Sequence, residues 1–122
     1  MPVSRKILLV DDSKLSLMSM RSLLEDYDFT ILEASDGYEA LDIIKNSKPA
    51  LVFLDLLMPN LDGVGVLEKL KAEDISVPVV VVSADIQNTT RAICFKLGAI
   101  DFVNKPMEPE KVKSIIDKVF QE

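Results

Sequence analysis

The chain has 122 residues, of which 48% are apolar and 28% charged, with 20 acidic and 14 basic side chains, a net charge of −6 and no histidine. This length suits one domain with its own hydrophobic core, so we expect residues 1–122 to form a single domain with no room for a second. The acidic balance argues against a nucleic-acid partner, because phosphate binding depends on clustered Lys and Arg. The lack of histidine excludes Ser-His-Asp and Cys-His catalysis and histidine-ligated zinc.

The sequence also bears on where the protein acts. The longest apolar run, at 77–82, is far shorter than the roughly 20 residues needed to cross a bilayer. The N-terminus has no apolar stretch of signal-peptide length. The single cysteine, Cys94, cannot form an internal disulfide, and we expect a packed thiol in a reducing compartment. These features predict a cytoplasmic protein that makes no membrane contact.

Five short runs of mostly β-branched or aromatic residues predict strands. In chain order they are Lys6–Val10, Thr30–Ala34, Leu51–Asp55, Pro78–Val82 and Asp101–Asn104. The first, third and fourth are almost continuously apolar, which is typical of parallel strands covered on both faces. The second is more mixed, which favours a place near an edge of the sheet.

A segment with helical spacing follows each strand. The helices are expected at 14–26, at about 37–47, after residue 62, after residue 85 and from about 109, with Ser13, Asp36, Asp62 and Asp85 as N-caps of the first four. The fourth is expected to turn Ile86, Ile93 and Leu97 inward and to stop at Gly98. Alternating strands and helices predict the α/β class, with a doubly wound parallel sheet covered by helices on both faces.

Polar residues stand where the strands end: Asp11, Asp12, Asp55, Ser83 and Lys105. The carboxyl ends of parallel strands meet at one edge of the sheet, where α/β proteins bind their ligands. Three carboxylates held close together repel one another unless a cation compensates. Because the available ligands are all oxygens, we expect Mg²⁺.

The residue types at this edge also suit phosphoryl transfer. Asp55 is the best candidate nucleophile because it ends a fully apolar strand, while Asp11 and Asp12 suit a metal-holding pair. The Lys105 ammonium and the Ser83 hydroxyl suit the oxygens of a transferring phosphoryl group. Taken singly, each residue has a plainer role, since aspartate and serine cap helices and a lysine before a proline fits a loop surface. Their convergence favours the chemical interpretation.

Four stretches of the sequence resemble the receiver domain of two-component response regulators. They are ILLVDDS at 7–13, LVFLDLLMPNLDG at 51–63, VVVSA at 80–84 and GAIDFVNKP at 98–106. The resemblance spans nearly the whole chain and is nearest to the stand-alone, CheY-like form. It implies a flavodoxin-like fold in which five helices surround a five-stranded parallel sheet of order 2-1-3-4-5.

The resemblance also implies a metal site and an acceptor. Asp55 resembles the residue that accepts the phosphoryl group. Asp12 and Asp55 would ligate Mg²⁺ directly, Asp11 would act through water, and the backbone carbonyl of Leu57 would complete the set of protein ligands.

Three further residues match the family's switch. Ser83 resembles the hydroxyl that moves to bond the phosphoryl group, Phe102 the aromatic side chain that then rotates inward, and Lys105 the lysine that pairs with the phosphoryl group. The Lys105–Pro106 bond resembles the family's cis peptide. Phosphorylation is expected to change the surface of the fourth helix, fifth strand and fifth helix, at 85–97 and 101–120.

The expected partners follow from the same resemblance. The phosphoryl group would come from a histidine kinase or a histidine phosphotransfer protein, which fits the lack of histidine here. The changed surface would bind a downstream target protein, and the chain would be a monomer or a weak dimer formed on phosphorylation. We expect no enzymatic activity beyond the domain's own phosphorylation and dephosphorylation.

Alternative functions stay open at this point. A metal-dependent phosphatase or phosphotransferase also uses an aspartyl phosphate, but it usually needs a second acid two residues after the nucleophile, where this chain has Leu57. A degenerate receiver would bind partners without phosphorylation, and the complete set of acidic and lysine positions argues against it. A nucleotide-binding role is disfavoured because no glycine-rich loop follows the first strand.

Overall fold

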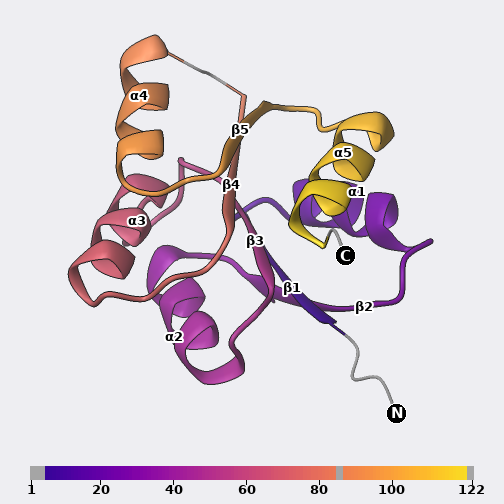
Figure 1. Cartoon of the computed structure of the whole chain (residues 1–122), viewed down its shortest axis with the longest axis horizontal. Helices are drawn as coiled ribbons and strands as arrows, with labels where there is room; N and C mark the ends of the chain where they lie inside the picture. Colours follow the sequence, from indigo (N-terminus) through magenta and orange to yellow (C-terminus); the bar gives the residue numbers. More distant parts are fainter. Residues whose placement is uncertain (1–4, 85–86, 121–122) are drawn as a thin grey trace.

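Five parallel strands form one sheet in the computed structural model, which describes residues 5–84 and 87–120. The strands are β1 (Arg5–Val10), β2 (Phe29–Ala34), β3 (Leu51–Leu54), β4 (Val79–Ser83) and β5 (Asp101–Asn104). Their order is β2-β1-β3-β4-β5 (Figure 1), and every neighbouring pair is parallel. The predicted class and strand order are confirmed.

Helices cover both faces of the sheet (Figure 1). They are α1 (Lys14–Leu24), α2 (Gly37–Ser47), α3 (Gly63–Ala72), α4 (Asn88–Lys96) and α5 (Pro109–Val119). Within the described part of the chain, no helix is long and apolar enough to span a membrane.

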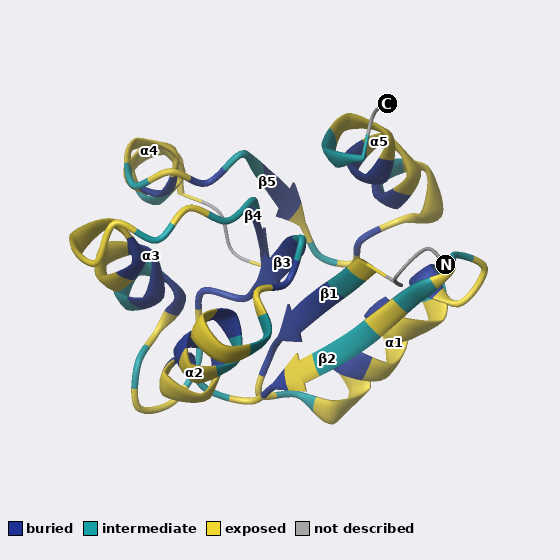
Figure 2. Cartoon of the chain, turned by 60° about the horizontal axis from the view of Figure 1, so that its bottom comes forward, coloured by how far each residue is buried: buried dark blue, intermediate teal, exposed yellow. Residues whose placement is uncertain are grey.

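Alternation of side chains along the strands divides the core into two layers. Leu8, Val52 and the strand residues that point to the same face pack with α2, α3 and α4. Ile7, Leu51 and the strand residues that point to the opposite face pack with α1 and α5. Figure 2 shows the central strands buried along most of their length, whereas β2 is partly exposed as an edge strand should be.

Side-chain caps begin the first three helices as predicted. Ser13, Asp36 and Asp62 each accept a hydrogen bond from the backbone N–H three residues further along, at 3.3, 2.9 and 2.8 Å. Each cap satisfies one of the N–H groups that a helix leaves unpaired at its start. Because these helices follow β1, β2 and β3, the caps help to define the loops at the carboxyl edge.

The start of α4 differs from the sequence prediction. Asp85, the expected cap, and Ile86, an expected core residue, lie outside the described residues. The helix begins at Asn88, and the side chain of Gln87 before it makes no capping hydrogen bond. Gly98 follows the helix with φ of 110°, as expected for a glycine that stops it.

The inward face of α4 is also rotated from the predicted one. Ile93, expected in the core, is 48% exposed, and Cys94 takes the buried position beside the partly buried Leu97. The prediction for Ile93 was wrong because both residues fit a helical spacing with Leu97, and packing against the sheet selects the smaller one. The prediction of a packed thiol at Cys94 is confirmed.

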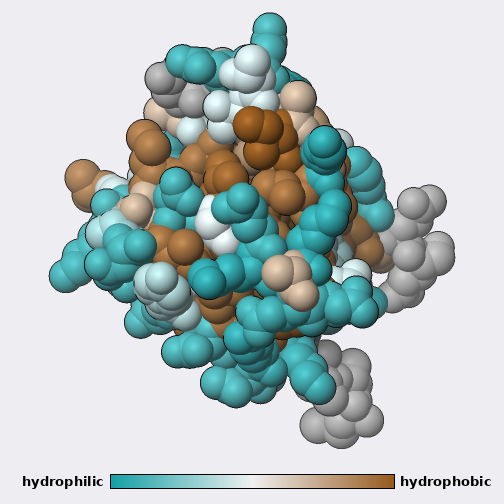
Figure 3. All heavy atoms as spheres, turned by 90° about the vertical axis from the view of Figure 1, so that its left-hand side faces the viewer, coloured by the Kyte–Doolittle hydropathy of each residue, from teal (hydrophilic) through white to brown (hydrophobic). Residues whose placement is uncertain are grey.

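Figure 3, which looks onto the side of the molecule with α2, α3 and α4, shows apolar surface gathered in its upper part.

Candidate functional site

The predicted polar residues meet at the carboxyl edge of the sheet. Asp11 and Asp12 follow β1 and Asp55 follows β3. The backbone N–H of Asp11 donates to the last carbonyl of β2 at 3.1 Å, and that of Asp55 to the last carbonyl of β1 at 3.0 Å. The backbone N–H of Lys105 donates to the Ser83 carbonyl at 2.9 Å. The strand ladder therefore positions all five residues at one edge.

The Lys105 ammonium lies between two buried carboxylates. Its Nζ is 2.6 Å from Asp11 Oδ2 and 3.3 Å from Asp55 Oδ2. Asp11 is 1% exposed and Asp55 is 7% exposed. A charge this far from water requires a charged partner or several hydrogen bonds. Across the described residues, no buried side-chain nitrogen or oxygen lacks a hydrogen-bond partner.

Burial and neighbouring charges shift two pKa values at this edge. Burial raises the pKa of Asp55 above its usual range, the negative charge of Asp11 raises it further, and Lys105 opposes both. Burial alone would lower the pKa of Lys105, but its hydrogen bond to Asp11 and the charges of Asp55 and Asp11 outweigh that effect and raise it. Lys105 therefore stays protonated at neutral pH.

Asp11, Asp12 and Asp55 suit a divalent cation. Each offers a carboxylate oxygen, and these three oxygens lie within 4.8 Å of one another. Asp12 is exposed, so an ion reaches the cluster from solvent. One lysine against three carboxylates leaves an excess of negative charge, and donors that are all oxygen favour Mg²⁺. The donor set of this chain therefore fits the ion that the sequence predicts.

Leu57 and Ser83 border the cluster. The backbone N–H of Leu57 donates to Asp55 Oδ1 at 3.4 Å, and the Leu57 side chain is 71% exposed. Ser83 is the last residue of β4 and is buried. Leu57 thus contacts Asp55 through its backbone, and its apolar side chain is exposed to solvent.

Phe102 lies in β5 rather than at the edge itself. Its ring is buried on the face covered by α2, α3 and α4, and the Arg91 guanidinium lies 5.5 Å from the ring centre. The rotation that the resemblance implies for this aromatic residue stays a prediction. The Lys105–Pro106 bond is cis, as the resemblance implies.

Sequence reasoning missed one polar contact at the edge. Ser16, in the first turn of α1, accepts a hydrogen bond from Lys105 Nζ at 3.4 Å. The signal available was a serine four residues after Asp12, on a helix that starts beside the aspartates.

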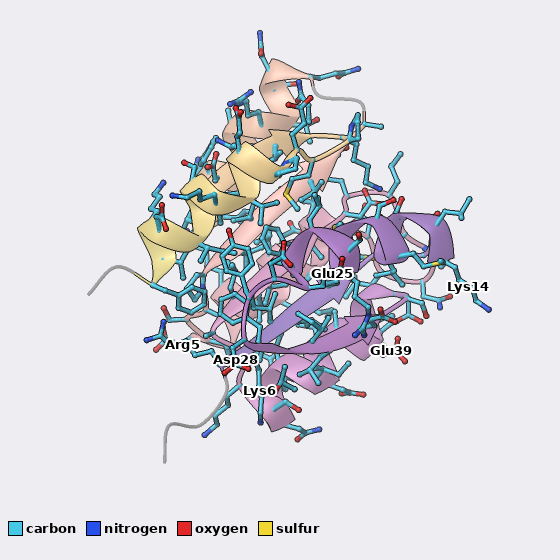
Figure 4. All side chains as sticks on the ribbon, turned by 90° about the vertical axis from the view of Figure 1, so that its right-hand side faces the viewer. Arg5, Lys6, Lys14, Glu25, Asp28 and Glu39 are labelled. Carbon is cyan, nitrogen blue, oxygen red and sulfur yellow. The ribbon has the colours of Figure 1, made fainter. Side chains whose placement is uncertain are left out.

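Figure 4 shows Lys14 at the same end of the molecule as Glu39 of α2, away from Arg5 and Lys6 at the start of β1.

Comparisons with known proteins agree with this geometry. The sequence profile of the response regulator receiver domain matches residues 7–117. The alkaline phosphatase synthesis transcriptional regulatory protein PhoP of Bacillus subtilis is 30% identical over 119 residues, which cover 98% of this chain and 50% of PhoP. The chain spans about half the length of the curated relatives it matches.

Solved structures give the same result. The signal receiver domain of a protein described as a LuxO repressor from Vibrio parahaemolyticus has a TM-score of 0.91 and 27% identity, covering 98% of this chain and 92% of that one. CheY in the CheX-CheY-BeF₃-Mg complex of Borrelia burgdorferi has a TM-score of 0.88 and 30% identity, covering 97% and 90%. Together with the profile match, these likenesses show that the chain belongs to the response regulator receiver domains, a family that in general accepts a phosphoryl group and uses Mg²⁺.

Proposed function

We propose that Asp55 accepts a phosphoryl group from a phosphohistidine on a histidine kinase or a histidine phosphotransfer protein. Asp11, Asp12, Asp55 and the backbone carbonyl of Leu57 would hold Mg²⁺ during the reaction. The observation that carries the proposal is the Lys105 ammonium, which lies 3.3 Å from Asp55 Oδ2 beside three clustered carboxylates. This arrangement supplies an acceptor, a cation site and a fixed positive charge within a few ångströms.

The transfer is a single displacement at phosphorus. A carboxylate oxygen of Asp55 forms a bond to phosphorus while the bond from phosphorus to the histidine nitrogen breaks, and the electron pair of that bond stays on the nitrogen. Lys105 pairs with one phosphoryl oxygen, and the Ser83 hydroxyl donates to another. A divalent cation at the cluster supplies positive charge that offsets repulsion between the two anions.

The composition of residues 1–122 supports a donor outside this domain. These residues contain no histidine, so the donor histidine would lie in a kinase or phosphotransfer domain other than this one. The domain would turn over no substrate other than its own phosphoryl group, and would act in the cytoplasm, whose reducing conditions suit the buried thiol of Cys94. This proposal holds for residues 1–122 acting alone, as expected from the sequence, and equally within a longer chain.

We further propose that phosphorylation changes the surface of α4, β5 and α5 and so binding to a downstream target protein. Ser83 and Lys105 are joined through their backbones at 2.9 Å, and Ser83 pairs with Asn104 of β5. A pull on either side chain toward a phosphoryl group therefore acts on β5 and on the buried Phe102. Amide hydrogen exchange with and without phosphodonor tests this, and an unchanged rate in α4 and β5 would contradict it.

The acceptor is tested by intact mass. The protein is incubated with a small-molecule phosphodonor, with and without Mg²⁺, and the mass of one added phosphoryl group is sought. We expect the adduct only with Mg²⁺ and its loss in Asp55→Asn.

Asp62→Asn is the matched control for this experiment. It makes the same chemical change in an exposed residue, and asparagine is as good a helix cap as aspartate, so the adduct should form. An adduct that persists in Asp55→Asn would remove the proposed acceptor. Turnover of added phosphomonoesters would favour a phosphatase instead.

A further inference from the structure

The loop between β3 and α3 carries the proposed acceptor and a proposed metal ligand. Residues 55–62 include Asp55 at one end and Leu57 within the loop. The base is closed, because the backbone N–H of Gly63 donates to the Leu56 carbonyl at 2.9 Å. A β-carbon at Gly63 would lie 2.6 Å from the Asp55 carbonyl oxygen, so the base is also tightly packed. The far part of the loop, around Asn60, extends toward α2.

A side-chain contact joins the far part of the loop to the start of α2. Asn60 Nδ2 donates a hydrogen bond to Asp36 Oδ2 at 3.1 Å. Asn60 adopts φ of 67°, a left-handed conformation that asparagine tolerates better than most residues. The other oxygen of Asp36 accepts the backbone N–H of Glu39 at 2.9 Å. One carboxylate therefore caps the helix and holds the loop.

A second contact, between backbones, reinforces the first. Gly37 is the first residue of α2, and a β-carbon there would collide with the Leu61 carbonyl and lie 2.7 Å from Leu61 Cβ. The Glu39 carboxylate accepts the backbone N–H of Ser35, the residue before the cap, at 2.6 Å. The carboxylate that receives Asn60 is itself held by the hydrogen bond from the Glu39 N–H to its other oxygen. We call the pair Asp36 and Asn60 the loop clamp.

We propose that the loop clamp positions the metal site. Asp36 and Asn60 act through the backbone of residues 55–61, which they hold against α2, so that Asp55 and Leu57 keep their relative places. Without the clamp, part of the binding free energy of an ion would be spent on ordering the loop. This inference deepens the proposed function and rests on it.

The test measures Mg²⁺ binding to the unphosphorylated chain by titration calorimetry. Asn60→Gly keeps access to the left-handed conformation and removes the amide. Asp36→Ser keeps a capping oxygen and removes the oxygen that receives Asn60. We expect each variant to bind Mg²⁺ about tenfold more weakly, the low end for residues that support a metal ligand without touching the metal. Both changes break one contact, so the double variant should bind no more weakly than either single variant.

Two further variants separate positioning from charge. Asp62→Ser also removes a carboxylate from a helix cap near the loop but leaves the clamp intact, and it should bind within about twofold of the parent. In the double variant Asp36→Asn with Asn60→Asp, donor and acceptor exchange places, and asparagine still caps α2. This exchange should restore most of the lost affinity, which a general loss of stability would not allow.

Asp12→Asn distinguishes failure of the clamp from failure of the proposed function. If Asp12→Asn binds Mg²⁺ like the parent, the proposed metal site is wrong. If Asp12→Asn loses binding while Asn60→Gly and Asp36→Ser keep the parent affinity, the clamp alone is overturned. Asp36→Ser and Asp62→Ser could instead weaken Mg²⁺ binding equally while Asn60→Gly has no effect. That result would assign the weakening to loss of negative charge and would also overturn the clamp.

Discussion

Helices α2 and α4 cover the same face of the sheet but are held in different ways. Helix α2 is capped at its start by the Asp36 side chain. At its end, the capping residue Lys48 adopts a left-handed conformation, and its backbone N–H donates to the Ile44 carbonyl at 3.1 Å. It buries Gly37, Ala40, Leu41 and Ile44. Among the described residues of α4, Asn88–Lys96, only Cys94 is buried, and no side chain caps the start.

If the domain switches as proposed, the difference divides the site into a fixed side and a side free to respond. The loop clamp joins α2 to the loop that carries Asp55. Ser83, Phe102 and Lys105 belong to β4, β5 and the loop that follows, and Phe102 lies in the same core layer as Cys94 of α4. An element with few buried contacts opens at a lower free energy than one with many. The proposed switch would use both properties, since its acceptor would be held in place while the surface that binds a partner moves.

The largest effect is expected when one buried residue in each helix is truncated and the losses in the free energy of unfolding are compared. Ile44→Ala in α2 should lower the free energy of unfolding by about 3 kcal/mol, because it leaves a cavity in the core. Cys94→Ala in α4 removes a single sulfur atom and should cost about 1 kcal/mol. Urea denaturation of both variants measures the difference. Equal losses would show that α4 contributes to the core as much as α2 does.

The next prediction concerns the ion pair that joins the two sides. Lys105→Met should lower the free energy of unfolding in the absence of Mg²⁺ by about 2 kcal/mol, because the buried carboxylate of Asp11 loses its ammonium partner. Lys111→Met is the matched control. Lys111 pairs with Asp101 at 3.2 Å with 42% of its side chain exposed, so its loss should cost less than about 1 kcal/mol. Similar losses in both variants would mean that Lys105 does not hold the two sides together.

Asp55→Asn should raise the free energy of unfolding, whereas Lys105→Met should lower it. Burial and the charge of Asp11 make the ionised form costly in the folded chain, so the neutral variant should be more stable by about 1 kcal/mol at neutral pH without Mg²⁺. The pKa of Asp55 is higher in the folded than in the unfolded chain. The cost is therefore absent below the ordinary aspartate pKa of about 3.9 and grows as the pH rises from there through the raised value.

Chemical denaturation of parent and Asp55→Asn across this pH range checks both size and sign. The stability gain of the variant should shrink as the pH falls through the raised pKa. A gain that stays constant with pH would show that ionisation of Asp55 is not the cause, and a loss at neutral pH would mean that Lys105 outweighs burial and Asp11.

The pattern of apolar residues along the strands predicts most of this architecture, because a buried strand has an apolar sequence. Continuously apolar runs mark central strands, the mixed run at 30–34 marks an edge, and polar residues at strand ends mark the site. The strand order came from resemblance to the family, since hydrophobicity alone does not say which strands are neighbours. The meeting of Asp11, Asp12, Asp55 and Lys105 then follows from parallel strands ending at one edge.

The features that sequence reasoning missed depend on how elements pack together. Ile93 and Cys94 both fit the periodicity of α4, and only contact with the sheet decides between them. The contact from Lys105 to Ser16 depends on how α1 lies against the loop after β5. The loop clamp joins polar residues 24 positions apart, a separation that leaves no periodic signal.

The smallest effect is expected when α4 is given a side-chain cap like the one that α2 already has. Gln87→Asp should supply a capping oxygen and a negative charge at the start of α4, which would stabilise that helix by about 0.5–1 kcal/mol. Amide hydrogen exchange in α4 should then slow by about two- to fivefold, while exchange in α2 stays unchanged. If phosphorylation acts by moving α4, the variant should also show a smaller difference in α4 exchange between the free and phosphorylated forms. Unchanged exchange in α4 would mean that the missing cap is not what separates this helix from α2, and that its few buried contacts alone do so.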